Sequence, residues 1–566
     1  MVRKIGKKFM AVTLAGAMMV AATGCGSKEM SKSDQAKIDN FFNQSTTSSA
    51  ICDTTEAAVK NDYVDVECCD ESECFNTRAT INNSVDNFEI PDDYNTNEFS
   101  NFNENSWESV ANKPLSTFAA DVDTAAYTNL RSYIDNGYDI DPSMIRLEEM
   151  INYFHYDYEV PAKDEKFAVT TEMADCPWNK DTKLALVALN TEPIDFSEAP
   201  ASNIVFLIDT SGSMFDSDKL PLVQQSLNML AENLTEKDRV SIVTYAGSDE
   251  VVLSGVAGNE YHTITSAIEG LYASGSTNGS AGINTAYEIA QKYFIKGGNN
   301  RVILATDGDL NVGVTSEGSL EELIKEKKES GVFLSVLGVG YGNYKDNKLE
   351  TLADKGNGNY AYIDSIFEAK KALVDDLGAN MNIVAKDVKL QVEFNPANVK
   401  GYRLLGYENR VMADQDFNDD TKDGGEMGAG HTVTALYEVA LTDSDMDIRS
   451  SDLKYSDKES SDIYANGNYD DEVFTLSVRY KEPDADKSEL SKFVCKTKDY
   501  SKFGSDNLRW AAAVTSFGLC LKNSEYKGDA SIDLVKELAN SVADANSDEY
   551  KAEFLSLVNA YDKYSN

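Results

Sequence analysis

Residues 204–213 read Ile204-Val205-Phe206-Leu207-Ile208-Asp209-Thr210-Ser211-Gly212-Ser213, and this stretch predicts both a fold class and the position of a site. Five consecutive apolar residues are typical of a strand that is covered on both faces, as in a parallel sheet. The polar residues that follow begin a turn at the carboxyl end of that strand. Because ligands of open α/β sheets bind outside the carboxyl ends of the strands, a site is expected in this loop.

The chain beyond this strand alternates between helical and strand patterns. Helical segments carry apolar residues on one side, and the strands are short apolar runs. Helices and strands are predicted in turn at 220–234, 240–243, 283–293, 302–304, 320–329 and 332–339. This alternation predicts an α/β domain, with a doubly wound and mostly parallel sheet, over residues 201–380.

Oxygen-bearing side chains gather in three loops of this domain. Besides the first loop, Ser-Thr-Asn-Gly at 276–279 precedes a predicted helix, and Asp-Gly-Asp at 307–309 follows a predicted strand. Carboxylate and hydroxyl oxygens suit a hard cation, Mg²⁺ or Mn²⁺. The candidate metal ligands are Asp209, Ser211, Ser213, Thr277 and Asp307. The alternative is that these residues cap helices and form turns without a metal.

The pattern Asp-x-Ser-x-Ser with a distant Thr and Asp resembles the metal-ion-dependent adhesion site of von Willebrand factor type A (VWA) domains. The resemblance implies that Ser211, Ser213 and Thr277 ligate the ion, and that Asp209 and Asp307 bind it directly or through water. It also implies one open coordination position, which an acidic residue of a partner fills.

The segments on both sides of this domain are rich in alternating β patterns. Strands are predicted at 167–171, 183–190, 388–394, 433–439 and 473–478, and those after residue 385 are expected to pair with those at 167–190. Helices are predicted at 121–133, 145–154, 508–522, 532–538 and 550–561. The VWA-like domain is therefore expected as an insertion between β-rich segments, followed by a C-terminal helical region. The predicted domains are 113–200, 201–380 and 381–566.

The flanking segments also resemble a family, the YfbK-like bacterial lipoproteins. The resemblance covers nearly all of residues 113–563 and rests on short motifs on both sides of the VWA-like domain. These motifs are residues 114–118, 121–125, 148–154, 385–388, 394–396, 406–410 and 511–514.

The N-terminus has the pattern of a lipoprotein signal peptide at residues 1–24. Four basic residues precede an apolar segment, and small residues precede Cys25, as in the bacterial lipobox. Cys25 is the expected lipidation site, and the acidic, polar residues 25–112 are expected to form a disordered tether. These features predict an exported protein that is lipid-anchored to the outer face of the cell membrane, or to the outer membrane in a Gram-negative host.

Net charge excludes several partners. The chain has 52 Lys and Arg against 95 Asp and Glu, a net charge of −43 over 566 residues. Such a surface repels phosphate backbones, so nucleic-acid binding is not expected. It repels anionic lipids as well, so membrane attachment needs the anchor at Cys25. Among the other cysteines, those at 52, 68, 69 and 74 lie together, whereas those at 176, 495 and 520 are expected to be buried thiols.

The function expected from these features is metal-dependent binding in the cell envelope. A protein or peptide would present Asp or Glu to the metal, so the chain is predicted to be an adhesion-type binding protein and not an enzyme. One alternative is a cell-envelope scaffold or assembly factor, which would work with an ATPase. Another is a hydrolase that uses the metal as a Lewis acid. The chain's histidines, His155, His262 and His431, lie in no catalytic motif.

Overall fold

The computed structural model describes residues 99, 102–120, 123–163, 165–194, 199–275, 279–308, 317–341, 346–376, 382–448, 469–483 and 485–565. All of them belong to one compact unit, residues 89–566. The predicted signal peptide, Cys25, the tether up to residue 98 and the cysteine group at 52–74 lie outside the described residues. Among the described helices, none combines the length and apolar character that a bilayer span requires.

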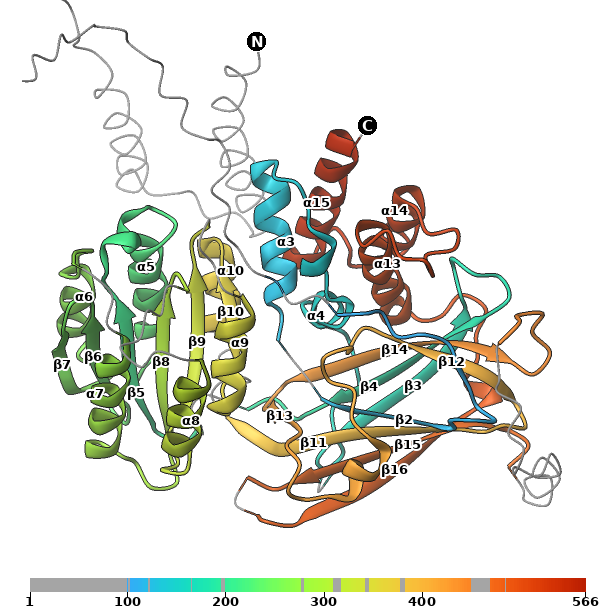
Figure 1. Ribbon diagram of the computed structural model, residues 1–566, viewed down its shortest axis with the longest axis horizontal. Helices are drawn as coiled ribbons and strands as arrows, with labels where there is room; N and C mark the ends of the chain where they lie inside the picture. Colours follow the sequence, from blue (N-terminus) through green and yellow to red (C-terminus); the bar gives the residue numbers. More distant parts are fainter. Residues whose placement is uncertain are drawn as a thin grey trace, which may run out of the picture. The chain divides into compact units, whose positions relative to one another are not determined.

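The VWA-like domain is built on a sheet whose described strands run in the order β10-β9-β8-β5-β6-β7 (Figure 1). Their bounds are β5 Ser202–Asp209, β6 Arg239–Tyr245, β7 Asp249–Ala257, β8 Asn299–Thr306, β9 Phe333–Val339 and β10 Tyr360–Ile363. Neighbouring strands are parallel except for the pair β6 and β7, which is antiparallel. Neither edge strand was predicted: β7 has no buried residue, and β10 is only four residues long.

Helices cover both faces of this sheet, as the alternating pattern predicts. Their bounds are α5 Leu220–Ala231, α6 Tyr261–Glu269, α7 Gly279–Lys292, α8 Glu317–Lys328, α9 Asp346–Lys355 and α10 Ile366–Lys370. One apolar cluster joins α5, α6 and α10 to the sheet, and a second joins α7, α8 and α9 to it. The central strand β5 contributes to both clusters, because its residues 204–208 are fully buried. The doubly wound, mostly parallel prediction is confirmed.

The β-rich segments form two further sheets. One has the order β1-β12-β14-β4-β3, and the other the order β13-β11-β15-β16 with β2 paired to β11. Their bounds are β1 Glu108–Ser109, β2 Leu115–Ala119, β3 Ala168–Asp175, β4 Lys183–Asn190, β11 Ile383–Phe394, β12 Val399–Leu405, β13 Gly425–Gly428, β14 Thr432–Leu441, β15 Glu472–Lys481 and β16 Ser488–Lys496. All the pairings are antiparallel, and one apolar core contains residues of both sheets.

The predicted pairing across the insertion is right for one strand and wrong for two. β14 pairs with β4, with Thr432 opposite Asn190. β11 and β15 instead pair with each other and pack across the core from β3 and β4. Period-two alternation shows which face of a strand is buried, but it does not show which strand lies beside it.

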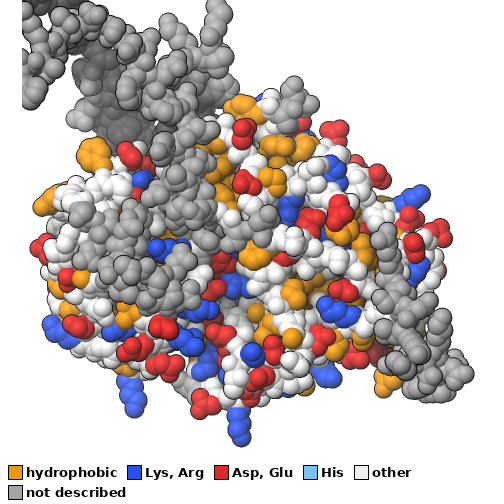
Figure 2. All heavy atoms as spheres, in the orientation of Figure 1, with side chains coloured by type: hydrophobic (Ala, Val, Ile, Leu, Met, Phe, Trp, Pro, Cys, Tyr) orange, Lys and Arg blue, Asp and Glu red, His pale blue; other side chains and the backbone are white. Residues whose placement is uncertain are grey.

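The remaining helices come from both ends of the described chain. α3 Ala125–Asn136 and α4 Leu147–Asn152 share one apolar cluster with α13 Asp506–Leu521, α14 Ile532–Asn540 and α15 Glu549–Ser565. Strands β4 and β14 also contribute to this cluster, so the helices are joined to the β region. On the face seen in Figure 2, acidic and basic side chains are interspersed and form no patch of a single sign.

Candidate metal site

Asp209 is the last residue of β5 and the most deeply placed of the predicted ligands that the structure describes. Its side chain is fully buried, and its Oδ1 accepts a hydrogen bond of 2.9 Å from the backbone N–H of Ser211. Its Oδ2 accepts hydrogen bonds from the Tyr245 hydroxyl at 3.2 Å and the Thr306 hydroxyl at 3.1 Å. Because Tyr245 ends β6 and Thr306 ends β8, three adjacent strands hold this carboxylate in one orientation.

The two predicted serines lie on the turn that follows β5. This turn continues as a short 3₁₀ helix, Gly212–Phe215, and the Oγ atoms of Ser211 and Ser213 are 3.0 Å apart. Serines two residues apart therefore do aim their hydroxyls at one region. The 270–275 loop is held against the turn, because Gly212 N–H donates to Gly275 O at 3.1 Å. Thr277 follows that loop directly, but it lies outside the described residues.

Asp307 comes to the same place from the neighbouring strand. β5 and β8 are parallel with Ile208 opposite Ala305, so the residues just beyond them lie side by side. Asp307 is buried and ion-pairs with Lys219, with 3.0 Å between Nζ and Oδ2. Lys219 Nζ also donates to the carbonyl oxygen of Ser213 at 3.0 Å. A cationic group thus already lies among the predicted ligand residues.

The electrostatics of these residues suit a cation. Burial raises the pKa of Asp209 to about 6, and the negative charge of Asp307 adds to the rise, although hydrogen bonds from Ser211 and Thr306 oppose it. Two carboxylates and two hydroxyls in one turn region form a donor set of hard oxygens, as Mg²⁺ or Mn²⁺ prefers. The residues present therefore fit the ion. Their role as ligands stays a prediction, in which Thr277 is the remaining member.

Sequence reasoning missed three residues of this site. Tyr245 and Thr306 are the last residues of their strands, the position at which a parallel sheet collects polar groups. That signal could have found them. Lys219 immediately precedes α5, and nothing in its spacing from Ser213 indicates that its ammonium reaches Asp307.

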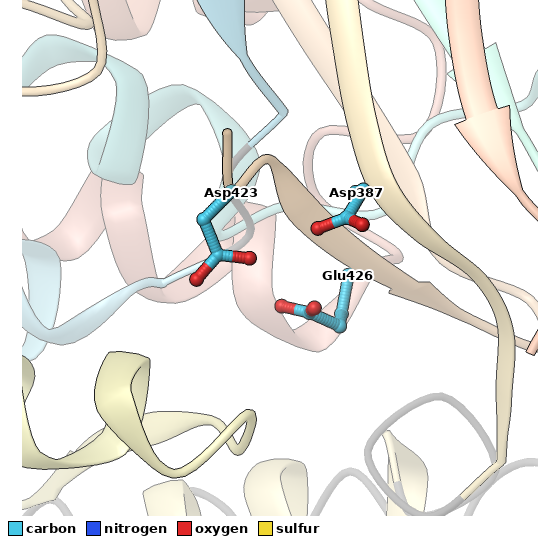
Figure 3. A group of neighbouring side chains, drawn as sticks. All are labelled: Asp387, Asp423 and Glu426. Atoms are coloured by element: carbon cyan, nitrogen blue, oxygen red, sulfur yellow. The ribbon is translucent and has the colours of Figure 1, made fainter. Parts of the chain in front are cut away.

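A separate acidic cluster lies where β11 and β13 run side by side (Figure 3). The cluster consists of Asp387, Asp423 and Glu426, whose nearest carboxylate oxygens lie within 4.8 Å of one another. Lys481 forms an ion pair with Asp387, and Lys328 Nζ is 3.8 Å from Asp423 Oδ2. These lysines offset part of the negative charge. Three adjacent carboxylates are therefore not by themselves evidence of a metal.

Ionisation of Glu426 should lower the free energy of unfolding as the pH rises. Burial, together with the charges of Asp423 and Asp387, raises the pKa of Glu426 to about 8, from an ordinary value of 4.5. The folded protein therefore keeps a proton that the unfolded chain has lost. This contribution to stability is complete below pH 4.5 and disappears as the pH rises to about 8.

Glu426→Gln should remove that dependence. We expect the variant to be more stable than the parent at pH 9, by at most about 5 kcal/mol, and no more stable at pH 4. Urea unfolding at the two pH values measures this. Glu393→Gln, an exposed position on β11, is the control, with less than about 0.5 kcal/mol expected at either pH. An equal effect of Glu426→Gln at both pH values would contradict the assignment.

The parallel sheet, the helices on its two faces and the polar turn after β5 define a VWA domain. The family described as von Willebrand factor type A domain matches residues 203–376. The family described as Uncharacterized protein YfbK, C-terminal, matches residues 379–564, and one described as von Willebrand factor matches residues 93–186. VWA domains commonly mediate protein–protein interactions and often bind a divalent metal.

The similarity to one relative extends over most of the chain. The protein described as Uncharacterized protein YfbK, from Escherichia coli strain K12, is 40% identical over 474 residues, covering 82% of this chain and 81% of the relative. The chain belongs to the YfbK-like family of VWA-containing proteins.

More distant relatives match a smaller part of the chain. Human inter-alpha-trypsin inhibitor heavy chain H4 is 26% identical over 147 residues, which cover 25% of this chain and 16% of that protein. Among solved structures, von Willebrand factor type A from Catenulispora acidiphila is 14% identical with a TM-score of 0.38, covering 68% of this chain and 89% of that one.

Proposed function

We propose that the chain binds a protein or peptide through a divalent cation, Mg²⁺ or Mn²⁺, at its VWA domain. The observation that carries the proposal is the convergence of Asp209, Ser211, Ser213 and Asp307 at the carboxyl ends of two adjacent parallel strands. The bound ion would supply an open coordination position for an Asp or Glu side chain of the partner.

The roles of the chain's own residues follow from their burial. Asp209 and Asp307 are buried and supply negative charge, whereas Ser213 and the neighbouring Gly212 are exposed. The predicted site therefore opens to solvent on the side of the serines. Without a metal, a partner carboxylate would meet the two buried aspartates, of which Lys219 offsets one. A cation at this point inverts the local sign of the field.

Two histidines, His155 and His431, make side-chain contacts in the described structure. His155 Nε2 lies 2.9 Å from Asp376 Oδ1 in an ion-pair geometry. His431 Nδ1 accepts a hydrogen bond from Gly428 N–H at 3.1 Å, and burial lowers the pKa of His431 to about 4. His431 immediately precedes β14, and Asp376 follows the helical segment Lys371–Asp375. We propose that the chain acts by binding and is not an enzyme.

We further propose that this binding takes place at the cell surface. The basic, apolar and small-residue pattern of residues 1–24 supports export, and Cys25 supports attachment by lipid. The acidic residues 25–112 would then separate the binding domain from the membrane.

Calorimetric titration of the purified protein with Mg²⁺ and Mn²⁺ tests the proposal. Asp209→Ala should weaken metal binding by more than about 100-fold, because Asp209 is a predicted ligand fixed by three hydrogen bonds. Asp216→Ala removes an exposed acid from the same turn and should leave the affinity within about threefold. Equal binding by the Asp209 variant and the parent would contradict the metal assignment.

A capture experiment with envelope extract separates the two candidate functions. If the parent retains a partner in Mg²⁺ and releases it in EDTA, and Asp209→Ala retains none, the metal-dependent binding proposal is supported. If the parent neither binds metal nor shows chelator-sensitive capture, the scaffold or assembly alternative is favoured, and capture that requires an ATPase would identify it.

A further inference from the structure

Lys219 is a buried lysine whose charge is directed into the predicted metal site. Its side chain is 10% exposed, and its Nζ lies 3.0 Å from both Asp307 Oδ2 and Ser213 O. Burying an ammonium group is costly unless it is paired. Here it is paired with one of the two predicted carboxylate ligands.

The fold holds the stem of Lys219 in a defined slot. The residue immediately precedes α5, where its N–H donates to Asp216 O at 3.0 Å and its carbonyl accepts from Val223 N–H at 2.9 Å. Its methylene groups lie against Gly340, just beyond β9. A Cβ at Gly340 would be 2.5 Å from Lys219 Cε and 2.7 Å from Cγ, and Gly340 has φ +78°, so only glycine suits this position. Packing as well as charge therefore holds the Lys219 ammonium beside Asp307.

A divalent cation that uses Asp307 would lie within a few ångströms of this ammonium. Like charges at such separations repel strongly in a partly buried site, where the effective dielectric constant is well below that of water. Without any cation, Asp209 and Asp307 would repel each other as two buried negative charges. Lys219 therefore offsets the same negative charge that a metal ion would offset.

We propose that Lys219 is an intramolecular cation that competes with the divalent ion for Asp307. The inference rests on the proposed metal site. Metal binding would replace the contact between Lys219 Nζ and Asp307 Oδ2, so the lysine lowers the affinity for metal. When metal is scarce, the lysine reduces the repulsion between Asp209 and Asp307. The domain would hold metal only at concentrations high enough to overcome this tethered charge.

Two substitutions at one position test the competition. Lys219→Gln keeps a hydrogen-bond donor but removes the charge, and we expect it to bind Mn²⁺ about tenfold more tightly than the parent in calorimetry. Its melting temperature in EDTA should fall, whereas saturating Mn²⁺ should restore it. Lys219→Arg keeps the charge and should bind Mn²⁺ no more tightly than the parent. Lys296→Gln removes an exposed charge before β8, at the opposite ends of the strands, and should change neither quantity.

The outcomes distinguish this inference from the proposed function. If the parent binds Mn²⁺ and Lys219→Gln binds it equally or more weakly, the competition is refuted while the metal site stands. If the parent shows no binding but Lys219→Gln binds Mn²⁺, the competition is supported. If neither protein binds Mn²⁺, both proposals fail. A failure of Lys219→Gln to fold even in Mn²⁺ would also overturn the competition, because the metal should replace the lost charge.

Discussion

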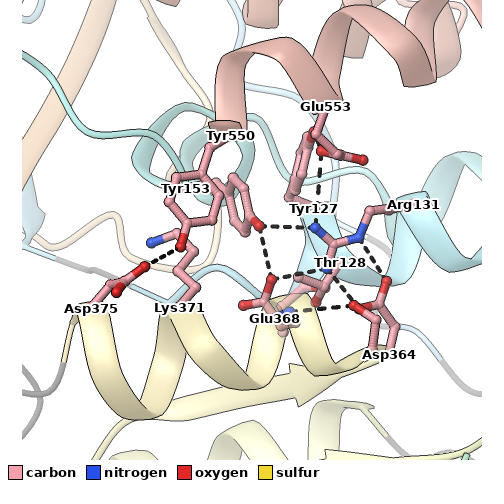
Figure 4. A network of polar contacts seen from close by, with 12 residues as sticks. Tyr127, Thr128, Arg131, Tyr153, Asp364, Glu368, Lys371, Asp375, Tyr550 and Glu553 are labelled. Carbon is pink, nitrogen blue, oxygen red and sulfur yellow. Dashed lines mark hydrogen bonds and ion pairs between the residues drawn. The ribbon is translucent and has the colours of Figure 1, made fainter. Parts of the chain in front are cut away.

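Replacing Arg131 with methionine should destabilise the protein by about 3–5 kcal/mol, because it leaves buried carboxylates without their cation. Arg131 lies on α3 and points toward the carboxylates of Asp364 and Glu368 (Figure 4). Its side chain is 4% exposed. Its guanidinium binds Asp364 in a two-pronged geometry, with distances of 2.6 and 2.8 Å, and Glu368 Oε2 at 2.9 Å. It also donates to the Tyr153 hydroxyl at 2.9 Å. One side chain therefore joins α3, α4 and the beginning of α10.

The expected loss is large because the partners of Arg131 are equally buried. The side chains of Asp364 and Glu368 are 7% and 2% exposed. Burial raises the pKa of Glu368, and Arg131 opposes that rise. Without Arg131, Glu368 must either take up a proton or remain charged in an apolar setting.

Guanidinium chloride unfolding, followed by circular dichroism, measures the effect. The control is Lys113→Met, which removes an exposed ion pair to Glu108 at 3.5 Å and should cost less than about 1 kcal/mol. A loss below about 1 kcal/mol for Arg131→Met as well would show that the network does not hold α10 to α3 and α4.

Trp510→Ala should cost about 3–5 kcal/mol, because it opens a cavity at the centre of the helical region. Trp510 lies on α13 and is fully buried. Its ring contacts Phe154 with centroids 5.2 Å apart and Phe554 at 5.3 Å, both edge to face. Trp510 therefore connects Phe154, just after α4, with α15, the last helix of the chain.

Phe503→Ala is the matched control for the loss of an aromatic ring. Phe503 shortly precedes α13 but is 74% exposed, so its removal should change the free energy of unfolding by less than about 0.5 kcal/mol. Urea unfolding of both variants makes the comparison. Similar small losses for the two would mean that the helical region does not unfold together with the rest of the protein.

Much of the fold was predictable because local polarity follows secondary structure. Residues 204–208 are all apolar because β5 is covered on both faces, and this run of five residues can be recognised in the sequence. β14 was predicted from an alternating pattern, but its residues 433–440 are all buried, because the helices cover one face and the second sheet covers the other. β7 was missed because an exposed edge strand does not have to be apolar.

Part of the candidate site was predictable on similar grounds. Asp209, Ser211 and Ser213 lie in one turn, so their proximity needs no tertiary contact. Asp307 is 98 positions after Asp209, but each directly follows or ends a buried parallel strand, and the carboxyl ends of such strands lie at one edge of the sheet. Thr277 and Cys25 lie outside the described residues and stay predictions.

Contacts that depend on the packing of whole elements could not be read from the chain. Lys219 reaches Asp307 only because α5 begins where it does and Gly340 leaves room for the stem. Arg131 contacts Asp364, which lies 233 positions later in the chain, and β11 pairs with β15 rather than with β3 or β4. A polarity pattern records whether a residue is buried, which is a property of its own position. Which residue lies opposite is a property of two positions at once, and in this protein only the packing of the sheets and helices determines it.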